Sequence, residues 1–378
     1  MMNRIGFFAL ASSALVMLAC GPSKLMVSPA RVVNVNVQPA SLQALFCPGD
    51  AFQIELVAKL DDGTLCSNID GGRGCMNEKD SIIDPSLVRI EASPGAFTDM
   101  SKFVFTPPVN PLETADAGIS LRGYLEDATG KSVVGERRVS PVYDCQREYV
   151  GSVPQPGKNG EPGQPGPDLT VTVTSLSTPW FSNAALIRVE NGSQKVYFIS
   201  PSADRPVRIV SKGQDGGAGA LGPAGAAGAD GAAAGAACTP GSNGMPGTSG
   251  GQGGDGGNGG PGGSIKLVVD DAKGEMLKAR VKLESIGGAA GLAGPGGAGG
   301  AGGRGGAGAA ADTMCASGGA AGADGSAGTS GPSGKPGKPG APGPAPAESA
   351  GARSALFASE MATITKIEAA KAAAKGTP

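Results

Sequence analysis

The chain has 378 residues, with 31 Lys and Arg against 33 Asp and Glu, and no histidine. The near-neutral charge gives no electrostatic reason to expect nucleic-acid binding, and the missing histidine removes the commonest general base and metal ligand. With 66 glycines, 30 prolines and only 4% aromatic residues, the composition favours a structural or binding protein. We therefore expect no enzyme activity, no cofactor and no metal site.

The N-terminus predicts export and a lipid anchor. Arg4 precedes an uncharged run from Ile5 to Leu18, which is too short to span a bilayer but suits the apolar region of a signal peptide. The run ends in MLAC, with Cys20 last, and this resembles a bacterial lipobox. The resemblance implies a signal peptide at 1–19, acylation of Cys20 and a lipidated tether at 20–30. The residue after Cys20 is Gly, not the Asp linked to inner-membrane retention, which implies the outer membrane. The alternative is an ordinary signal peptide that leaves Cys20 unmodified.

Residues 31–150 contain short runs of alternating apolar and polar residues, which are typical of β-strands. We expect a β-sandwich that is immunoglobulin-like in outline, although the Cys-Trp-Cys pattern is absent because the sole Trp is Trp180. The expected strands are 32–37, 52–57, 87–91, 102–105, 119–125 and 137–143, with turns at 61–63, 93–95 and 129–130.

Six cysteines follow Cys20, and an even number in an oxidising compartment predicts three disulfides. Cys47 and Cys145 lie near the two ends of the 31–150 domain, so a bridge between them would tie its edges. Cys66 and Cys75 flank a glycine-rich loop, which we expect them to close. Cys238 and Cys315 remain, and neither zinc-finger spacing nor a C-x-x-C pair occurs among the six.

A second, smaller β element is expected from residues 168–212 together with 264–287. Residues 169–174 alternate cleanly, 207–210 form a further strand, and Asn191-Gly192 is a hairpin signal. Residues 264–286 predict another hairpin with its turn at 271–274. The Ala-rich tail at 346–378 has good helix formers and predicts a short C-terminal helix.

Glycine recurs at every third position in 213–263 and 288–345, and a short Gly-X-Y linker occupies 151–167. The phase breaks near Cys238 and again near Cys315, so the order tract, break, tract occurs twice. Glycine at every third residue suits the polyproline II helix, which has three residues per turn and then presents one bare face. The fold class is therefore mainly β with added glycine-rich polyproline II tracts.

The composition of the tracts leaves three alternatives open. GEPGQPGP and GPSGKPGKPGAPGP are collagen-like, and that resemblance implies a homotrimer. GGDGGNGGPGG and GGAGGAGGRGG resemble the polyproline II bundles of phage adhesins and of the springtail antifreeze protein. This second resemblance implies antiparallel rods within one chain, a Cys238–Cys315 disulfide across neighbouring turns, and the 264–286 hairpin at the opposite end. Disorder is the third alternative, because low-complexity sequence often has no fixed structure.

Acidic residues are the only candidates for site chemistry. Asp61-Asp62 and Asp270-Asp271 lie in turn contexts, where carboxylates usually act as turn formers. Asp255 lies in GGQGGDGGNGG, which is similar to the calcium-binding nonapeptide of β-roll proteins but lacks its large apolar residue. We expect neither catalysis nor a calcium site from these residues.

These observations together predict a non-enzymatic cell-surface lipoprotein with a structural or adhesive role in the cell envelope. The membrane is its expected partner through the lipid on Cys20, and an envelope or extracellular protein or a glycan is a further expected partner. The alternative is a ligand-binding module, for glycan or an envelope protein, in which the glycine-rich tracts are only a spacer.

Overall fold

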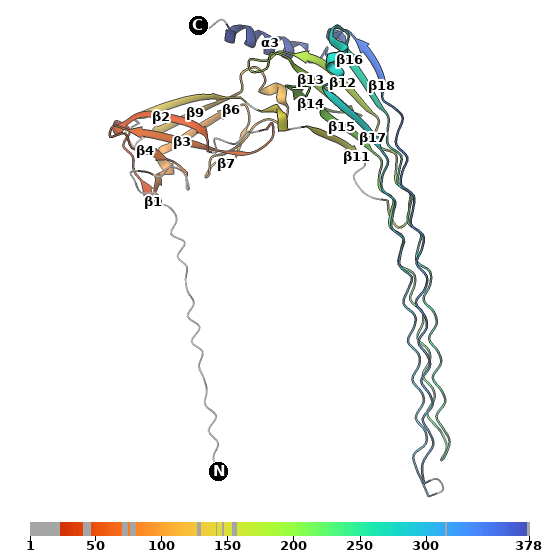
Figure 1. The fold of residues 1–378 in the computed structure, drawn as a ribbon. Helices are drawn as coiled ribbons and strands as arrows, with labels where there is room; N and C mark the ends of the chain where they lie inside the picture. Colours follow the sequence, from red (N-terminus) through yellow and green to blue (C-terminus); the bar gives the residue numbers. More distant parts are fainter. Residues whose placement is uncertain are drawn as a thin grey trace, which may run out of the picture. The chain divides into compact units, whose positions relative to one another are not determined.

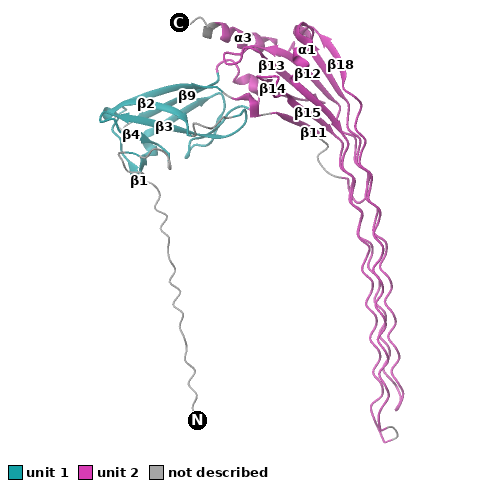
Figure 2. Ribbon diagram, viewed as in Figure 1, with its two compact units in different colours: residues 1–108, 118–140 teal, residues 109–117, 141–378 magenta. Residues whose placement is uncertain are grey.

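The computed structural model describes residues 23–40, 47–69, 75, 81–126, 130–140, 142–145, 147–152, 157–313 and 316–375. The signal peptide and Cys20 lie outside these residues. The chain is mainly β, as predicted, and forms two compact units (Figure 2). Unit 1 holds residues up to 108 and 118–140, whereas unit 2 holds 109–117 and 141–378. Within the described residues no helix is long and apolar enough to cross a membrane.

Unit 1 contains a two-stranded sheet and two larger sheets that share one core (Figure 1). One sheet has the order β2-β3-β8-β7 with β4 paired to β3, and the other has the order β10-β9-β6. Leu56 and Phe105 of the first sheet and Leu121 of the second are fully buried in this core. Bounds of the elements in unit 1 are β1 Ser23–Leu25, β2 Val32–Pro39, β3 Phe52–Leu60, β4 Leu65–Ser67, β5 Ser81–Ile83, β6 Val88–Ser93, β7 Ala96–Asp99, β8 Val104–Thr106, β9 Ile119–Glu126 and β10 Ser132–Val139, with β1 parallel to β5 and short 3₁₀ turns at Pro29–Arg31 and Pro85–Leu87.

The strands expected in unit 1 are present, although several of their ends differ, most of all for β8 and β10. The strand expected at 137–143 is wrong beyond residue 139, where β10 ends, and Tyr143–Cys145 instead forms a 3₁₀ turn. Proline at 141 has no N–H to donate to a ladder, so the strand cannot continue through it. The strand expected at 102–105 begins only at Val104, because Phe103 has a positive φ of 53°.

The β part of unit 2 is built from two sheets, ordered β14-β13-β12-β16-β18 and β11-β15-β17. Apolar side chains of β12 and β16 from one sheet and of β15 from the other form a common buried cluster. The strands are β11 Glu148–Ser152, β12 Leu169–Leu176, β13 Ala184–Asn191, β14 Gln194–Ser200, β15 Val207–Lys212, β16 Ile265–Asp270, β17 Val281–Ile286 and β18 Ala347–Gly351. The hairpin predicted at Asn191-Gly192 is confirmed, since β13 and β14 pair antiparallel around it.

The hairpin predicted at 264–286 is wrong. Strands β16 and β17 lie in different sheets, where β16 runs parallel to β12 and β18, and β17 runs parallel to β15. Between them lie a 3₁₀ turn at Asp271–Lys273 and helix α1 at Gly274–Lys278. The Asp270 carboxylate accepts a hydrogen bond from the Ala272 N–H, which starts this helical connection. The expected second arm of the hairpin therefore combines part of a helix, with the buried Leu277, and a true strand.

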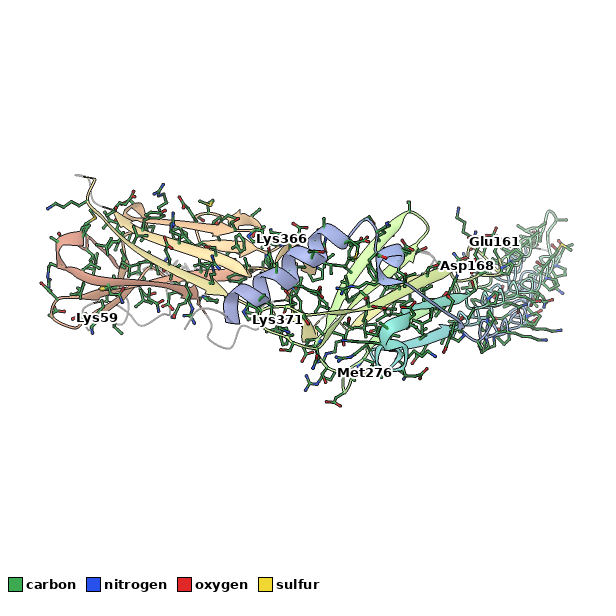
Figure 3. All side chains as sticks on the ribbon, turned by 90° about the horizontal axis from the view of Figure 1, so that it is seen from above. Lys59, Glu161, Asp168, Met276, Lys366 and Lys371 are labelled. Atoms are coloured by element: carbon green, nitrogen blue, oxygen red, sulfur yellow. A yellow bond between two sulfur atoms is a disulfide. The ribbon has the colours of Figure 1, made fainter. Side chains whose placement is uncertain are left out.

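The predicted C-terminal helix is confirmed as α3, Met361–Lys375, after the short α2 at Arg353–Leu356. Ile364 and Ile367 of α3 are fully buried in a cluster that also contains Leu186 of β13 and Leu112 of the 3₁₀ turn Pro111–Glu113. Lys366 points away from this cluster, and its Nζ lies 2.7 Å from a carboxylate oxygen of Asp116 (Figure 3).

Candidate interaction surface: the glycine-rich rod

The strands of unit 2 continue directly into extended glycine-rich tracts that lie side by side as a rod (Figure 1). We name these the first hairpin (157–167) and tracts A (213–235), B (241–263), C (287–309) and D (319–346). Strands β11, β15 and β17 lead into the first hairpin, tract A and tract C. The first hairpin, tract B and tract D lead back into β12, β16 and β18.

Backbone hydrogen bonds at every third residue hold the tracts together. Tract A runs parallel to C, with the Gly216 N–H donating to the Ala289 carbonyl at 2.9 Å, and tract B runs parallel to D in the same way. Tracts A and B are antiparallel, as are B and C, and C and D. This three-residue period is the one that a polyproline II conformation gives. The tracts therefore pack within a single chain, as the resemblance to glycine-rich bundles implied.

Tracts A and D each bond to both B and C, whereas no hydrogen bond joins A to D among the described residues. The four tracts therefore form a two-by-two arrangement with B and C in the middle. A Cβ added to Gly300 of tract C would overlap the Ala226 carbonyl of tract A, and one added to Gly302 would overlap the Gly325 carbonyl of tract D. Tract C thus needs glycine at two of its three positions wherever A and D both approach this closely, as at Gly300 and Gly302.

Doubled glycine also marks where the first hairpin packs. Side chains at Gly257 and Gly260 of tract B would overlap carbonyl groups of the first hairpin, at Glu161 and Gln164. The first hairpin ends beside this level, and further along tract B the corresponding positions are Thr248, Met245 and Ser242. The second glycine is therefore needed where the first hairpin covers tract B, whereas a Cβ at Gly251 or Gly254 would meet Pro223 or Ala220 of tract A.

The proline-rich triplets lie in the outer elements, tract D and the first hairpin. In tract D the glycine N–H groups donate to tract C, as Gly337 does to the Gly291 carbonyl. Prolines between these glycines cost no hydrogen bond, because no donor is needed at their positions. The collagen-like interpretation of these triplets is wrong for this structure, since their glycine N–H groups are already paired within the chain.

Acidic and amide side chains in the rod cap backbone groups of the neighbouring tract. The Asp255 carboxylate accepts a hydrogen bond from the Lys335 N–H at 2.7 Å, which gives this residue a structural role in place of the β-roll pattern. Asp215 does the same for the Ala289 N–H at 2.8 Å. This hydrogen bond, reinforced by Lys212, holds the pKa of Asp215 below its usual value. The same role is played by Asp230, Asn243, Asn258 and Asp324.

Two opposite faces of the rod differ in chemistry. The Asp215 carboxylate caps the Ala289 N–H, and the Asp230 carboxylate caps the Arg304 N–H. Both pairs are 74 residues apart in the sequence, so the rows of exposed side chains that contain them run in register along tracts A and C. The side chains between these caps are all exposed and apolar, and we call them the A–C strip. The strip consists of Ala218, Leu221, Ala224, Ala227, Ala289, Leu292, Pro295, Ala298 and Ala301.

The opposite face, between tracts B and D, is mainly polar, although Pro246, Ala323 and Pro332 are also exposed on it. Its exposed rows include Asn243, Ser249, Gln252, Asp255 and Asn258 of tract B, and Ser326, Thr329, Lys335 and Lys338 of tract D. The two large side chains of the A–C strip, Leu221 and Leu292, are 69% and 75% exposed. The rod is therefore amphipathic across its thickness.

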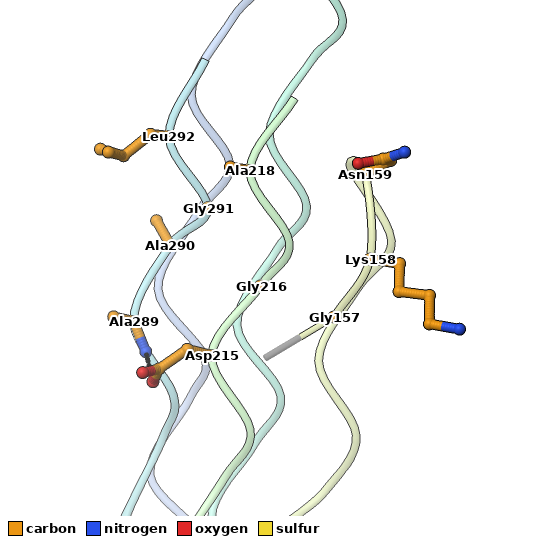
Figure 4. Close-up of a pocket in the computed structure, with 10 residues that line it drawn as sticks. All are labelled: Gly157, Lys158, Asn159, Asp215, Gly216, Ala218, Ala289, Ala290, Gly291 and Leu292. Carbon is orange, nitrogen blue, oxygen red and sulfur yellow. Dashed lines mark hydrogen bonds between the residues drawn. The ribbon is translucent and has the colours of Figure 1, made fainter. Parts of the chain in front are cut away.

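A concavity of about 590 Å³ lies at the end of the A–C strip, beside the first hairpin (Figure 4). Tract A lines it with Asp215, Gly216 and Ala218. Lys158 of the first hairpin and Leu292 of tract C point outward on opposite sides of it (Figure 4). The concavity thus combines the Asp215 carboxylate, the Lys158 ammonium group and the Asn159 amide with Leu292 and a surface of glycine and alanine residues.

The structure places most of the sequence-predicted cysteines. Cys66 and Cys75 form the predicted disulfide. Cys47, Cys145 and Cys238 are also disulfide-bonded, and Cys238 lies at the turn between tracts A and B with a positive φ of 64°. Cys20 and Cys315 lie outside the described residues, so the Cys47–Cys145 and Cys238–Cys315 pairings stay predictions.

The acidic pairs act as turn formers, as their sequence context predicted. Asp61 and Asp62 both bind the Arg31 guanidinium next to the β3–β4 turn, and Asp62 also accepts from the Thr64 N–H. Asp270 additionally accepts from the buried Thr174 hydroxyl at 2.7 Å. Sequence reasoning missed the division of the rod into an apolar and a polar face. The signal was present, because the residue type at every third position separates these faces.

No protein-family model, curated protein or solved structure matches this chain.

Proposed function

We propose that this protein is a non-enzymatic outer-membrane lipoprotein whose rod is a stiff spacer and contact surface in the cell envelope. The observation that carries the proposal is the pairing of glycine N–H groups along four neighbouring tracts. A rod held by backbone hydrogen bonds at every third residue resists bending more than a single polyproline II strand does. Seven triplets in tract A extend for roughly 65 Å at about 3.1 Å per residue, so such a spacer would project well beyond the sheets of unit 2.

The lipid anchor is supported by the lipobox-like sequence that ends at Cys20. Two or more acyl chains on one residue are needed for stable anchoring of a soluble domain. Mass spectrometry of the mature N-terminal peptide, with fractionation of the membranes, tests this part. We expect an acylated N-terminal Cys20 in the outer-membrane fraction, and Cys20→Ser should abolish both. A mature N-terminus elsewhere, without acyl chains, would refute the anchor.

The alternative function is a ligand-binding role for unit 1, towards a glycan or an envelope protein. Seven strands form the orders β2-β3-β8-β7 and β10-β9-β6. When they are lettered A to G in chain order, these sheets read ABED and GFC, which supports an immunoglobulin-like module. Such sandwiches often present binding loops at their ends. A glycan array probed with the full Cys20→Ser chain separates the two functions. Binding to defined glycans would favour the alternative, whereas binding to none would leave the spacer role as the better account.

A further inference from the structure

We propose that the A–C strip is a self-association surface, through which two copies of this chain pair with their rods parallel. The occupant is a second copy of the same strip, and the proposal goes beyond the anchored-spacer function without depending on it. The first reason is the strip itself. Nine consecutive side chains on two adjacent rows are exposed and apolar, while the opposite face of the same rod is mainly polar. An exposed, contiguous apolar patch rimmed by charged residues marks an interaction site.

The dimensions of the strip suit a weak, reversible dimer. Between the levels of Asp215 and Asp230 it extends for roughly 45 Å, and two rows of about 5 Å each give an area on the order of 450 Å². Two such strips would bury about 900 Å² in total, slightly less than the roughly 1,000 Å² that a stable interface exceeds. We therefore expect a dimer that forms at high local concentration.

Charge selects the parallel arrangement. With a two-fold axis along the rods, each residue of tract A faces the residue 74 positions later in tract C of its partner. Asp230 of one protomer then faces Arg304 of its partner, and the reverse pair forms as well. The Arg304 side chain makes no ion pair or hydrogen bond with any described residue, so its guanidinium is available. An antiparallel pairing would instead place tract A on tract A and bring Asp215 opposite Asp230, two like charges.

The same register matches the apolar residues. The 74-residue offset places Leu221 opposite Pro295 of the partner, and Ala218 opposite Leu292 of the partner. Each large side chain therefore lies opposite a smaller or flatter one, which lets the two faces approach. The edge formed by tracts A and B also exposes apolar side chains, among them Pro223 and Met245, but the hydroxyls of Ser242 and Thr248 interrupt them. On this edge Pro223 has no N–H, and the Ala226 N–H is capped by the Thr248 hydroxyl at 2.7 Å.

Sedimentation velocity of the full chain with Cys20→Ser, which cannot be acylated, tests the proposal over a range of concentrations. We expect the average mass to rise from one chain towards two. Leu221→Glu combined with Leu292→Glu should keep the protein monomeric throughout. The matched control places the same charges on the polar face, as Gln252→Glu with Ser326→Glu, and should dimerise as the parent does. Equal melting temperatures for both variants would show that the rod itself is intact.

A second series tests the direction of pairing. Arg304→Glu should weaken the dimer by about tenfold at low salt, because two symmetric surface pairs are replaced by repulsion. In an Asp230→Asn background, which keeps the oxygen that caps the Arg304 N–H, the same change should have a smaller effect. A chain that stays monomeric at every concentration overturns the proposal, as does a dimer that the Leu221 and Leu292 variant leaves unchanged. If Leu221→Glu with Leu292→Glu abolishes the dimer but Arg304→Glu leaves its affinity unchanged, the parallel arrangement is overturned.

Discussion

Glycine in the rod is required position by position, according to how many neighbours a tract has. Tract C contacts A, B and D, and its positions 300 and 302 both face carbonyl groups of other tracts. Its third position, as at Ala298, is exposed and accepts a side chain. The residue type at each position therefore reports whether backbone or solvent lies beside it.

Gly300→Ala should destabilise the rod strongly. The added Cβ would overlap the Ala226 carbonyl, and the nearest atoms are all backbone, so no side chain can move aside to make room. We expect a loss of about 1–3 kcal/mol or more in the free energy of unfolding, the range seen for overpacked interiors. Ala298→Ser, on the exposed row of the same tract, is the control and should change stability by less than about 0.5 kcal/mol. Thermal unfolding of both variants checks this expectation, and equal melting temperatures would contradict the packing described.

Asp255 should act as a backbone cap and not as a calcium ligand. Asp255→Ala removes the acceptor of the Lys335 N–H and should cost about 0.5–1 kcal/mol, whereas Asp255→Asn keeps an acceptor and should be nearly neutral. Urea unfolding with and without calcium chloride measures both points. Stabilisation by calcium that disappears in Asp255→Asn would show that the capping role is incomplete.

Stability should also depend on pH through Asp215. Its pKa in the folded protein is lowered, first by the hydrogen bond from the Ala289 N–H and then by Lys212. The usual value of about 3.9 applies to the unfolded chain, so the ionised group stabilises the fold above that pH. This contribution is lost as the pH falls through the folded-state pKa. Asp215→Asn should therefore show a smaller loss of stability than the parent when urea unfolding is repeated from neutral pH to below about 4. Identical pH profiles would be evidence against this role.

At the scale of elements, local periodicity was enough to predict most strands, the period-three tracts and the C-terminal helix. Pairing between distant segments was not readable, because one apolar alternation suits either a hairpin arm or a strand in a parallel sheet. Residues 264–286 show this, since β16 and β17 each pair with strands from elsewhere in the chain. Division of the rod into faces required knowing which tracts are neighbours. Only the register of hydrogen bonds supplies that information.

The C-terminal helical segment is held to its sheet by a buried ion pair. An oxygen of the Glu360 carboxylate lies 3.0 Å from the Arg188 guanidinium, and the other accepts from the Tyr197 hydroxyl at 2.7 Å. Glu360→Ala would leave Arg188 buried without this partner, so we expect a loss of about 3 kcal/mol or more in the free energy of unfolding. Lys366→Ala removes the exposed partner of Asp116, whose side chain is 16% exposed and still accepts from the Ala117 N–H, so it should cost about 1 kcal/mol. Urea unfolding of the two variants compares them, and similar losses would argue against the buried pair as the anchor of the segment.

For unit 2, the organising feature is a unit repeated three times. Each repeat leaves the three-stranded sheet, extends through glycine-rich chain, turns, and returns to the five-stranded sheet. The repeats comprise 148–176, 207–270 and 281–351. The first is cut short after one turn, whereas the other two extend along the full rod. When the repeats stack, tracts that follow one another in the chain run antiparallel, whereas A runs parallel to C and B runs parallel to D. The hydrogen bonds show this arrangement.

Hydrogen exchange in the tracts, followed by mass spectrometry at a concentration where the chain is monomeric, tests this account most directly. In tract A one row of N–H groups donates to tract C, and those of Gln214, Gly217, Ala226 and Ala232 have other acceptors, so about half of the amides should be protected there. In tract B two rows donate, one to D and one to A, so close to two in three should be protected. Greater protection in tract B than in tract A, in a monomer, is the result that the packed rod predicts. Equal protection in all tracts of a trimer would show a triple helix, and rapid exchange throughout would show disorder; either would contradict the rod.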